Sequence, residues 1–305
     1  MNTGNAVHTM RAQVLASIEE EFVRVRGRTL DLVARYPDLF GEGGDADFHW
    51  LEQDSRPVSM LITRSMKFVS GGHTWTGALI GWVHTLRELQ GKGFAAALLD
   101  AVADRLTDER HDFLLLWAHQ HGYYRDRGYH VSDSGLLAEG TVAAMSAALP
   151  GAGFVSMEVA LADISPKECH ALDGLAEASQ RGGMPFANRH LARTPLPFER
   201  VSLVRSGKAL QPDAYALLGH QPDWVTVLEG AGDARALSAL VANAAQGVAN
   251  IRVNARRGSV LHRALEPVLT FQPKPLAMYR PLSSRFGDDE LFHAAGWSFP
   301  WFDRM

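Results

Sequence analysis

Apolar positions in the first half of the chain recur at spacings that predict alternating helices and strands. Residues 6–39 repeat apolar side chains every three or four positions, which predicts helix with a break at Gly27. Short runs rich in branched and aromatic residues then predict strands at 48–52, 58–64, 78–85 and 111–117, with a hairpin turn at 70–73. The last two strands are almost wholly apolar, as expected of strands buried on both faces. Between them, residues 94–106 carry a helical apolar stripe.

A similar pattern follows more faintly after residues 149–153, whose proline and glycines predict a linker. Strands are predicted at 155–161, 214–218, 224–228, 251–254 and 276–280, and helices at 166–179, 233–245 and 259–265. Because element types recur in similar order, we interpret the chain as a tandem repeat of one fold. The predicted domains are 1–150 and 151–305, and an unrelated mixed second domain is the alternative.

Composition narrows the class of protein. The chain has 305 residues, 46% hydrophobic and 21% charged, which is typical of a globular protein long enough for two cores. A net charge of −4 argues against nucleic-acid binding, because that requires a basic surface. The first residues lack a signal-peptide pattern and no run approaches the ~20 apolar residues of a membrane helix, so we expect a cytoplasmic protein without a membrane partner.

The strongest chemical signal is a strand, a glycine-containing loop and a helix in succession. The loop reads Gln90, Gly91, Lys92, Gly93, Phe94, Ala95. Glycines let backbone N–H groups turn toward one point, and the start of a helix favours negative charge there. With the cation of Lys92, this pattern predicts a site for a diphosphate.

Two motifs in order give a resemblance. Gln90, Gly93 and Ala95 occupy the fixed positions of the coenzyme motif Arg/Gln-x-x-Gly-x-Gly/Ala, and residues 123–129 fit the stretch Phe/Tyr-Tyr-x-x-x-Gly-Phe/Tyr. The sequence therefore resembles the GNAT N-acetyltransferase superfamily, of the tandem type with a degenerate second copy. The resemblance implies an α/β (α+β) protein of two GNAT-like domains. Each would have a mixed, mostly antiparallel twisted sheet with helices on both faces, and the first would contain a splayed parallel strand pair.

The resemblance also implies an activity and a site. A GNAT domain moves an acetyl group from acetyl-CoA to a primary amine by direct attack, without a metal. Coenzyme-binding residues would be Val83, His84 and Thr85 on the fourth strand of the GNAT fold, together with the loop residues Gln90, Gly91, Lys92, Gly93, Phe94 and Ala95. Tyr124 would protonate the departing thiolate, for which a phenol is a suitable donor at neutral pH.

A general base is less clear in the sequence. The strand at 78–85 contains no carboxylate, where members of the superfamily often have one. His84, His119 and His121 are candidates because imidazole titrates in a useful range, and a chain of water molecules is the alternative.

The second half lacks the coenzyme motif. Glu229 and Asp233 bring negative charge to the corresponding loop, which argues against a second coenzyme site. The aromatic tail at 292–305 is expected to pack on the second domain or to line the acceptor cleft. A coenzyme-binding regulator without turnover and a protein-interaction module are the competing functions. The sequence leaves open the acceptor, a small molecule or a peptide, and the oligomeric state.

Overall fold

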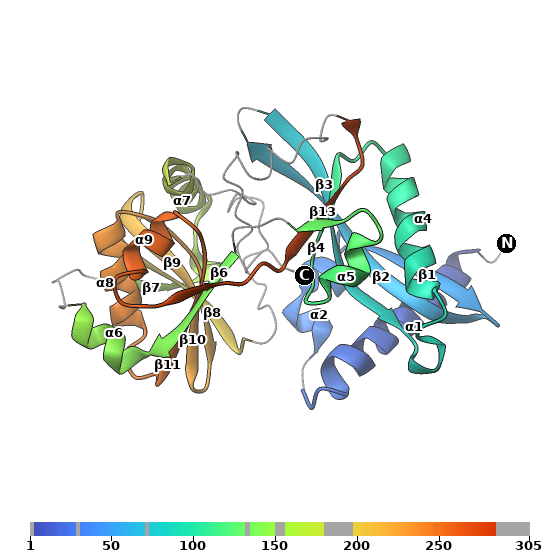
Figure 1. The fold of residues 1–305 in the computed structure, drawn as a ribbon, viewed down its shortest axis with the longest axis horizontal. Helices are drawn as coiled ribbons and strands as arrows, with labels where there is room; N and C mark the ends of the chain where they lie inside the picture. The colour runs from blue at the N-terminus through green and yellow to red at the C-terminus, as the bar shows by residue number, and fades with distance from the viewer. Residues whose placement is uncertain are drawn as a thin grey trace.

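The computed structural model describes residues 3–28, 31–70, 73–131, 135–149, 156–179 and 198–284. These residues form two lobes, each built on one β-sheet (Figure 1). The first sheet has the strand order β1-β2-β3-β4-β13-β5. Its strands are β1 (Asp47–Gln53), β2 (Arg56–Ser70), β3 (His73–Thr85), β4 (Phe113–Trp117), β13 (Ala277–Pro281) and β5 (His130–Val131). The helices of this lobe are α1 (Thr3–Glu19), the π-helical turn η1 (Glu20–Arg24), α2 (Leu32–Arg35), α3 (Pro37–Phe40), the 3₁₀ turn η2 (Arg87–Leu89), α4 (Phe94–Asp108) and α5 (His121–Arg125).

The second sheet has the order β12-β6-β11-β10-β9-β8-β7. Its strands are β12 (Phe271–Pro273), β6 (Gly135–Thr141), β11 (Asn250–Arg256), β10 (Trp224–Gly232), β9 (Gln211–Gln221), β8 (Arg200–Lys208) and β7 (Met157–Ala160). Its helices are α6 (Val142–Ala148), the 3₁₀ turn η3 (Leu161–Asp163), α7 (Pro166–Ala178), α8 (Ala234–Ala244) and α9 (Val260–Leu265). Both sheets contain one parallel pair, β3–β4 and β10–β11, and the remaining pairs are antiparallel.

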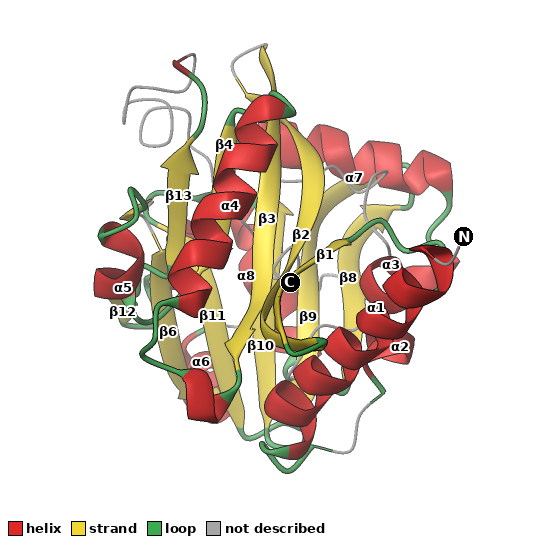
Figure 2. Cartoon of the chain, turned by 90° about the vertical axis from the view of Figure 1, so that its right-hand side faces the viewer, coloured by secondary structure: helices red, strands yellow, loops and turns green. Residues whose placement is uncertain are grey.

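Strand alternation places apolar clusters on both faces of the first sheet. Leu61 packs with α4 on one face, whereas its neighbours Met60 and Ile62 pack with α1 and the following segment on the other. Successive side chains of a strand point to opposite faces, so one strand supplies both cores. Figure 2 shows α4 lying across the strands of this sheet. The second lobe repeats this arrangement, with α8 and α9 packed on one face and α7 on the other.

The two lobes exchange one strand each. β6 follows β5 in the sequence but lies in the second sheet, where it pairs with β11 and β12. β13, near the end of the described chain, lies in the first sheet and pairs with β4 and β5. The crossing of β13 into the first lobe is visible in Figure 1. Apart from this exchange, the order β1-β2-β3-β4 in the first sheet corresponds to β8-β9-β10-β11 in the second, so these strands of the two sheets share the same order.

The tandem mixed architecture predicted from the sequence is confirmed, with departures in detail. The helix predicted over residues 6–39 is interrupted by the π-helical turn and resumes only as short helices. β6, α6 and β8 were not predicted. Because β6 and β13 are exchanged, the sheets do not divide at residue 150 as the predicted domains do, and that domain division stays a prediction. The tail at 292–305 lies outside the described residues.

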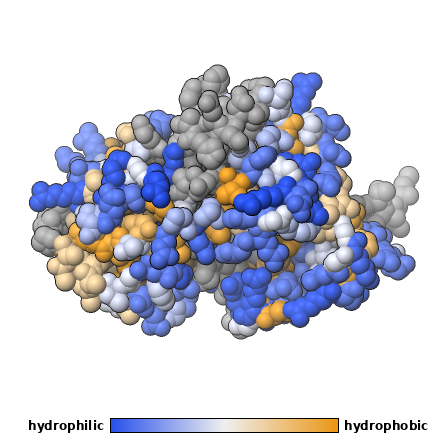
Figure 3. All heavy atoms as spheres, viewed as in Figure 1, coloured by the Kyte–Doolittle hydropathy of each residue, from blue (hydrophilic) through white to orange (hydrophobic). Residues whose placement is uncertain are grey.

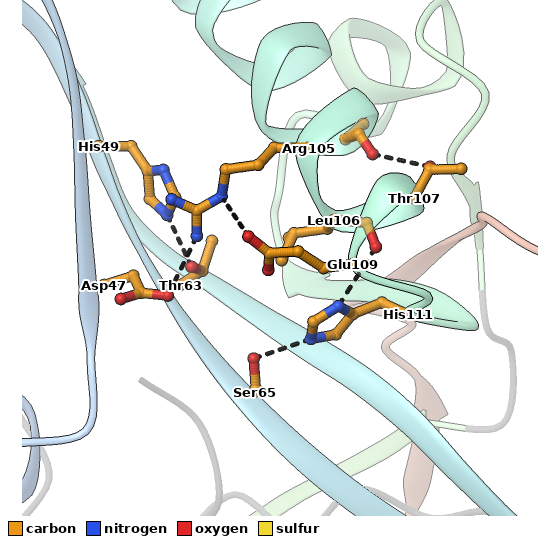
Figure 4. Close-up of polar contacts among 10 residues, drawn as sticks. Asp47, His49, Thr63, Ser65, Arg105, Leu106, Thr107, Glu109 and His111 are labelled. Atoms are coloured by element: carbon orange, nitrogen blue, oxygen red, sulfur yellow. Dashed lines mark hydrogen bonds and ion pairs between the residues drawn. The ribbon is translucent and has the colours of Figure 1, made fainter.

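Polar contacts fix the C-terminal end of α4 to the first sheet (Figure 4). The ring of His111 donates from Nδ1 to the carbonyl oxygen of Leu106 at 3.2 Å, since a carbonyl can only accept. Its Nε2 then accepts from the hydroxyl of Ser65 at 2.8 Å in the neutral ring. Arg105 of α4 donates to the carboxylate of Asp47 on β1 at 3.1 Å. These contacts hold α4 at a fixed place along the strands.

His49 provides a test of this region by pH. It is buried, its Nε2 lies 2.7 Å from the hydroxyl of Thr63, and burial, reinforced by Arg105, lowers its pKa to about 4. The unfolded chain binds a proton near pH 6.5 and the folded chain does not, so stability should fall as the pH drops through the window from about 6.5 to about 4. We expect a loss on the order of 1–3 kcal/mol from this residue, measured by urea unfolding at several pH values.

The matched control is His49→Gln, which removes the titrating ring. The variant should lose part of this pH dependence while other histidines keep theirs. Identical pH profiles of the two proteins would contradict a depressed pKa at His49.

Candidate functional site

A bulge in β3 shapes the site. The β2–β3 register places one residue of β2, Leu61, opposite two residues of β3, Trp82 and Val83. Trp82 has φ 56°, in the left-handed region that a bulky residue seldom adopts. Such a conformation costs about 1–3 kcal/mol and persists only where the surroundings hold it.

Three aromatic rings hold the bulge in place. The Trp82 ring is 8% exposed and makes edge contacts with Phe22, Tyr36 and Phe40, at centroid distances of 5.2, 5.4 and 5.5 Å. Each such pair contributes about 0.5–1.5 kcal/mol beyond burial, so together they can offset the backbone strain. The segment after α1 therefore supports the bulge directly.

β3 and β4 separate before the bulge is reached. They pair in parallel over only three residue pairs, 77–79 with 113–115. β3 then continues to Thr85 and β4 to Trp117 without further pairing to each other. The backbone of this part of β3 therefore faces an opening instead of a neighbouring strand, and the splayed parallel pair predicted for the first half is confirmed.

The connection from β3 to α4 has the geometry expected of an anion-binding loop. Gly91 and Gly93 adopt φ 77° and 87°, a region that favours glycine. Gly93 caps α4, and no side chain of the described residues accepts a hydrogen bond from the first amides of that helix. The side-chain amide of Gln90 donates to the carbonyl oxygen of Thr85 at 3.0 Å, which ties the loop to the end of β3.

The loop, the end of β3, the start of α4 and the segment around α5 line a cavity of about 550 Å³, which we call the loop cavity. This size is usual for a small-molecule site. Of the residues predicted to bind the coenzyme, all but the exposed Lys92 line it, and so does Tyr124. The lining residues are Val83, His84, Thr85, Leu89, Gln90, Gly91, Gly93, Phe94, Ala95, Ala96, Gln120, Tyr123, Tyr124 and Arg127.

A second cavity of about 540 Å³, the N-terminal cavity, adjoins the first. Three residues, Val83, Gln120 and Tyr124, line both cavities and so mark where they meet. The full lining is Phe22, Arg26, Arg28, Tyr36, Ile80, Gly81, Trp82, Val83, Leu116, Trp117, Ala118, His119, Gln120 and Tyr124. Among the described residues, neither lining includes a carboxylate.

Tyr124 lies at the junction of the cavities. Its ring packs edge-on against Tyr123 and Tyr129, at centroid distances of 5.1 and 5.7 Å. Burial, followed by the neighbouring Tyr123, raises the pKa of its hydroxyl, so the group stays protonated at neutral pH. A protonated phenol at this point can donate a proton to a group bound in either cavity.

The three candidate histidines lie in different places. His84 lines the loop cavity, and burial lowers its pKa, which keeps the ring neutral near pH 7. His119 is exposed and lines the N-terminal cavity. His121 begins α5 and lines neither cavity, and its buried Nε2 has no hydrogen-bond partner among the described residues. The geometry thus brings His84 and His119, but not His121, to the cavities.

The connection from β10 to α8, which corresponds to the glycine loop between β3 and α4, leaves no room for a similar loop. β10 ends at Gly232 and α8 begins at Ala234, so no loop separates them. Asp233 caps α8 by accepting from the amide of Ala236 at 2.8 Å. The carboxylate of Glu229 is buried and accepts from the Tyr215 hydroxyl at 2.5 Å. The helix start therefore already holds a negative charge, which agrees with the absence of the coenzyme motif.

Several lining residues were missed by the sequence analysis. Arg26 and Arg28 come from the segment after α1, where a short basic run was the available signal. Gln120 lies shortly before the tyrosine motif and Arg127 lies within it, and only the motif could have suggested them. In the part of the chain that the structure describes, no group of His, Cys, Asp and Glu could hold a metal ion, and no helix is long and apolar enough to span a membrane.

Comparison with known proteins identifies the class. A family model described as an acetyltransferase (GNAT) domain matches residues 11–132. No curated protein matches the chain. Among solved structures, a conserved Enterococcus faecalis V583 protein of unknown function, described as a probable N-acyltransferase, is 14% identical with a TM-score of 0.72, covering 93% of this chain and 72% of that one.

Two further solved structures share the fold of this chain. A GCN5-related N-acetyltransferase from Anabaena variabilis is 16% identical with a TM-score of 0.70, over 92% of this chain and 71% of that one. A tandem GNAT protein from the clavulanic acid biosynthesis pathway is 11% identical with a TM-score of 0.53, over 78% of this chain and 84% of that one. Residues 11–132 match the GNAT domain model, and the second sheet repeats the strand order of the first, so the chain has a tandem GNAT-like fold.

The left-handed glycine of the loop can be tested by one substitution at two sites. A Cβ at Gly93 or at the exposed helical Gly174 would meet no atom within 4 Å, so only the backbone distinguishes them. Gly93→Ala should destabilise the protein by about 1–2 kcal/mol because of its positive φ. Gly174→Ala should stabilise it by about 0.5–1 kcal/mol, both measured by urea unfolding. Equal effects would mean that the loop backbone is not left-handed at Gly93.

Proposed function

We propose that the protein is an acetyl-CoA-dependent N-acetyltransferase that acetylates a primary amine of a small molecule or peptide. The observation that carries the proposal is that one cavity joins three features, namely the glycine loop, the unpaired edge of β3 and Tyr124. The GNAT family match and the solved structures support an N-acyltransferase activity in general. The donor and the kind of acceptor are the parts we propose.

The residues of the loop cavity fit acetyl-CoA. Uncapped amides at the start of α4 and two glycines with positive φ suit a diphosphate, because N–H groups there have no side chain in front of them. The part of β3 around Val83, which has no pairing with β4, suits an amide-containing chain that binds as an extra strand. Lys92, which is exposed beside the loop, would contribute charge rather than a fixed contact.

The chemistry divides between the coenzyme and the chain. Acetyl-CoA would supply an activated thioester. Tyr124 would donate the proton to the leaving sulfur, and its raised pKa keeps that proton available. The proton of the amine would go to one of two histidines. These are His84, which is neutral in the loop cavity, and His119, which lies in the N-terminal cavity. His121 is the first residue of α5, and any contribution it makes would be to the position of that helix.

One observation favours the alternative of a coenzyme-binding regulator without turnover. Neither cavity is lined by a carboxylate among the described residues, so the base must be a histidine or water. We nevertheless favour an enzyme, because a binding protein has no need of a protonated phenol where the cavities meet. The cytoplasmic location stays a prediction.

Coenzyme binding is the first test. Calorimetric titration of acetyl-CoA should give micromolar affinity, about −8 kcal/mol. Gly93→Asp should abolish it, because the new carboxylate would stand where the diphosphate is proposed to bind. Gly174→Asp, the same substitution on an exposed helix, should bind as the wild type does. Unchanged affinity in Gly93→Asp would place the coenzyme elsewhere, and no binding by the wild type would exclude both the enzyme and the regulator.

The proton donor is tested by Tyr124→Phe, which removes only the hydroxyl. We expect kcat to fall by about 10²–10⁴-fold while the affinity for acetyl-CoA is retained. Tyr123→Phe, the neighbouring phenol in the same cavity, should keep most of kcat. Equal kcat for wild type and Tyr124→Phe at saturating substrate would remove the acid role. Coenzyme binding with no turnover on any amine would instead favour the regulator.

A further inference from the structure

The N-terminal cavity has an unusual balance of charge. Arg26 and Arg28 are the two charged side chains in its described lining, and both are cations. Arg28 is partly buried, and its pKa is lowered first by burial and then by the neighbouring guanidinium of Arg26. Arg26 is exposed, so water screens part of the repulsion between the two guanidinium groups, and an anion bound in the cavity would relieve the remainder.

The acidic residues nearby are engaged elsewhere. Arg24 pairs with Glu19 and Glu20 at 3.8 Å, and Arg87 pairs with Glu21 at 3.6 Å. Within the part of the chain that the structure describes, no carboxylate forms an ion pair with Arg26 or Arg28. Their charges are therefore available to a ligand in the cavity.

Both arginines are positioned by the same residue. The guanidinium of Arg26 lies over the Phe22 ring, 4.9 Å from its centroid, and Arg28 donates to the Phe22 carbonyl oxygen at 3.3 Å. Phe22 in turn packs against Trp82 of the bulge. A guanidinium that is held in this way keeps most of its N–H donors free for a planar anion.

The other lining residues indicate what kind of ligand body the N-terminal cavity would bind. Phe22, Tyr36, Trp82 and Trp117 present aromatic surface, and the junction with the loop cavity lies at Val83, Gln120 and Tyr124. Arg26 and Arg28 line only the N-terminal cavity. An acceptor in this cavity would thus place its amine toward Tyr124 and another part of its structure toward the arginines.

We propose that the acceptor is an amine that also carries an anionic group, a carboxylate in the first instance, on an aromatic or apolar body. Arg26 and Arg28 bind the anion, and the aromatic wall binds the body. Polycationic amines are disfavoured by the same two arginines. This inference rests on the proposed function, because it names the acceptor of the same site.

The test compares matched acceptors. Phenylalanine, tryptophan and glycine are each compared with their amides, which lack the carboxylate, by kcat/KM with acetyl-CoA as donor. The α-amine of each amide is less basic than that of the acid, so a larger fraction of it is unprotonated and reactive. Amine basicity alone would therefore favour the amides, and a preference for the acids cannot be explained by it. We expect at least about a tenfold preference for the aromatic acids, equivalent to about 1.4 kcal/mol. A preference for the amides, or for a polyamine such as spermidine, would overturn the proposal.

Variants connect the preference to the arginines. Arg28→Gln should reduce the acid-to-amide ratio about tenfold, and Arg28→Lys should restore part of it. Arg257→Gln, which removes an equal charge from an exposed site beyond β11, should leave the ratio unchanged. Acetyl-CoA affinity should be the same in all of them, and its loss in Arg28→Gln would mean that the arginines bind the coenzyme's phosphates instead.

A second readout separates this proposal from the proposed function. Binding of the same acids and amides is measured by calorimetry on protein saturated with coenzyme A, which requires no turnover. If the acids bind better but no amine is acetylated, the anion site stands and the catalytic proposal falls. If amines are acetylated and neither turnover nor binding favours the acids, the anion site falls and the catalytic proposal stands. Absence of binding by every acid would also overturn the anion site.

Discussion

The site depends on a limit to strand pairing, since β3 can pair with β4 over only three residues. Their pairing ends at Leu79, before the bulge at Trp82, and residues of β3 beyond that point line both cavities. Unpaired backbone inside a protein is unfavourable unless it finds a partner. The early end of the β3–β4 pairing thus leaves backbone to which a ligand can bind as a further strand. The aromatic contacts of Phe22, Tyr36 and Phe40 hold the strained backbone of Trp82 in its conformation.

The two halves show how one architecture can be open or closed at equivalent positions. In the first, residues 86–93 separate β3 from α4 and no side chain caps the helix. In the second, β10 leads almost directly into α8, and the carboxylate of Asp233 satisfies its amides. A few residues of loop and one capping side chain therefore distinguish them. On the one face that Figure 3 draws, hydrophilic residues cover much of both lobes, and apolar residues are more frequent on the lobe of the second sheet.

Local patterns in the sequence predicted local structure well. The helices predicted at 94–106, 166–179, 233–245 and 259–265 depend on neighbours within a few positions, and the structure bears them out as α4, α7, α8 and α9. The charge of the N-terminal cavity could not be predicted, because Arg26 and Trp82 meet only through tertiary packing. Nor could the exchange of β6 and β13, since a strand's own residues do not specify which of two equivalent sheets it joins.

The strand exchange has a consequence for how such a chain can evolve. Each half lacks a strand that the other provides: Tyr279 of β13 fills a core position beside Phe113 and Leu115, and Ala138 of β6 does so beside Val253. A gene encoding the first half alone would specify a sheet with a gap between β4 and β5. Selection on the loop cavity therefore also preserves the second half, which supplies β13. The second copy is free to lose its chemistry, but the chain is not free to lose the second copy.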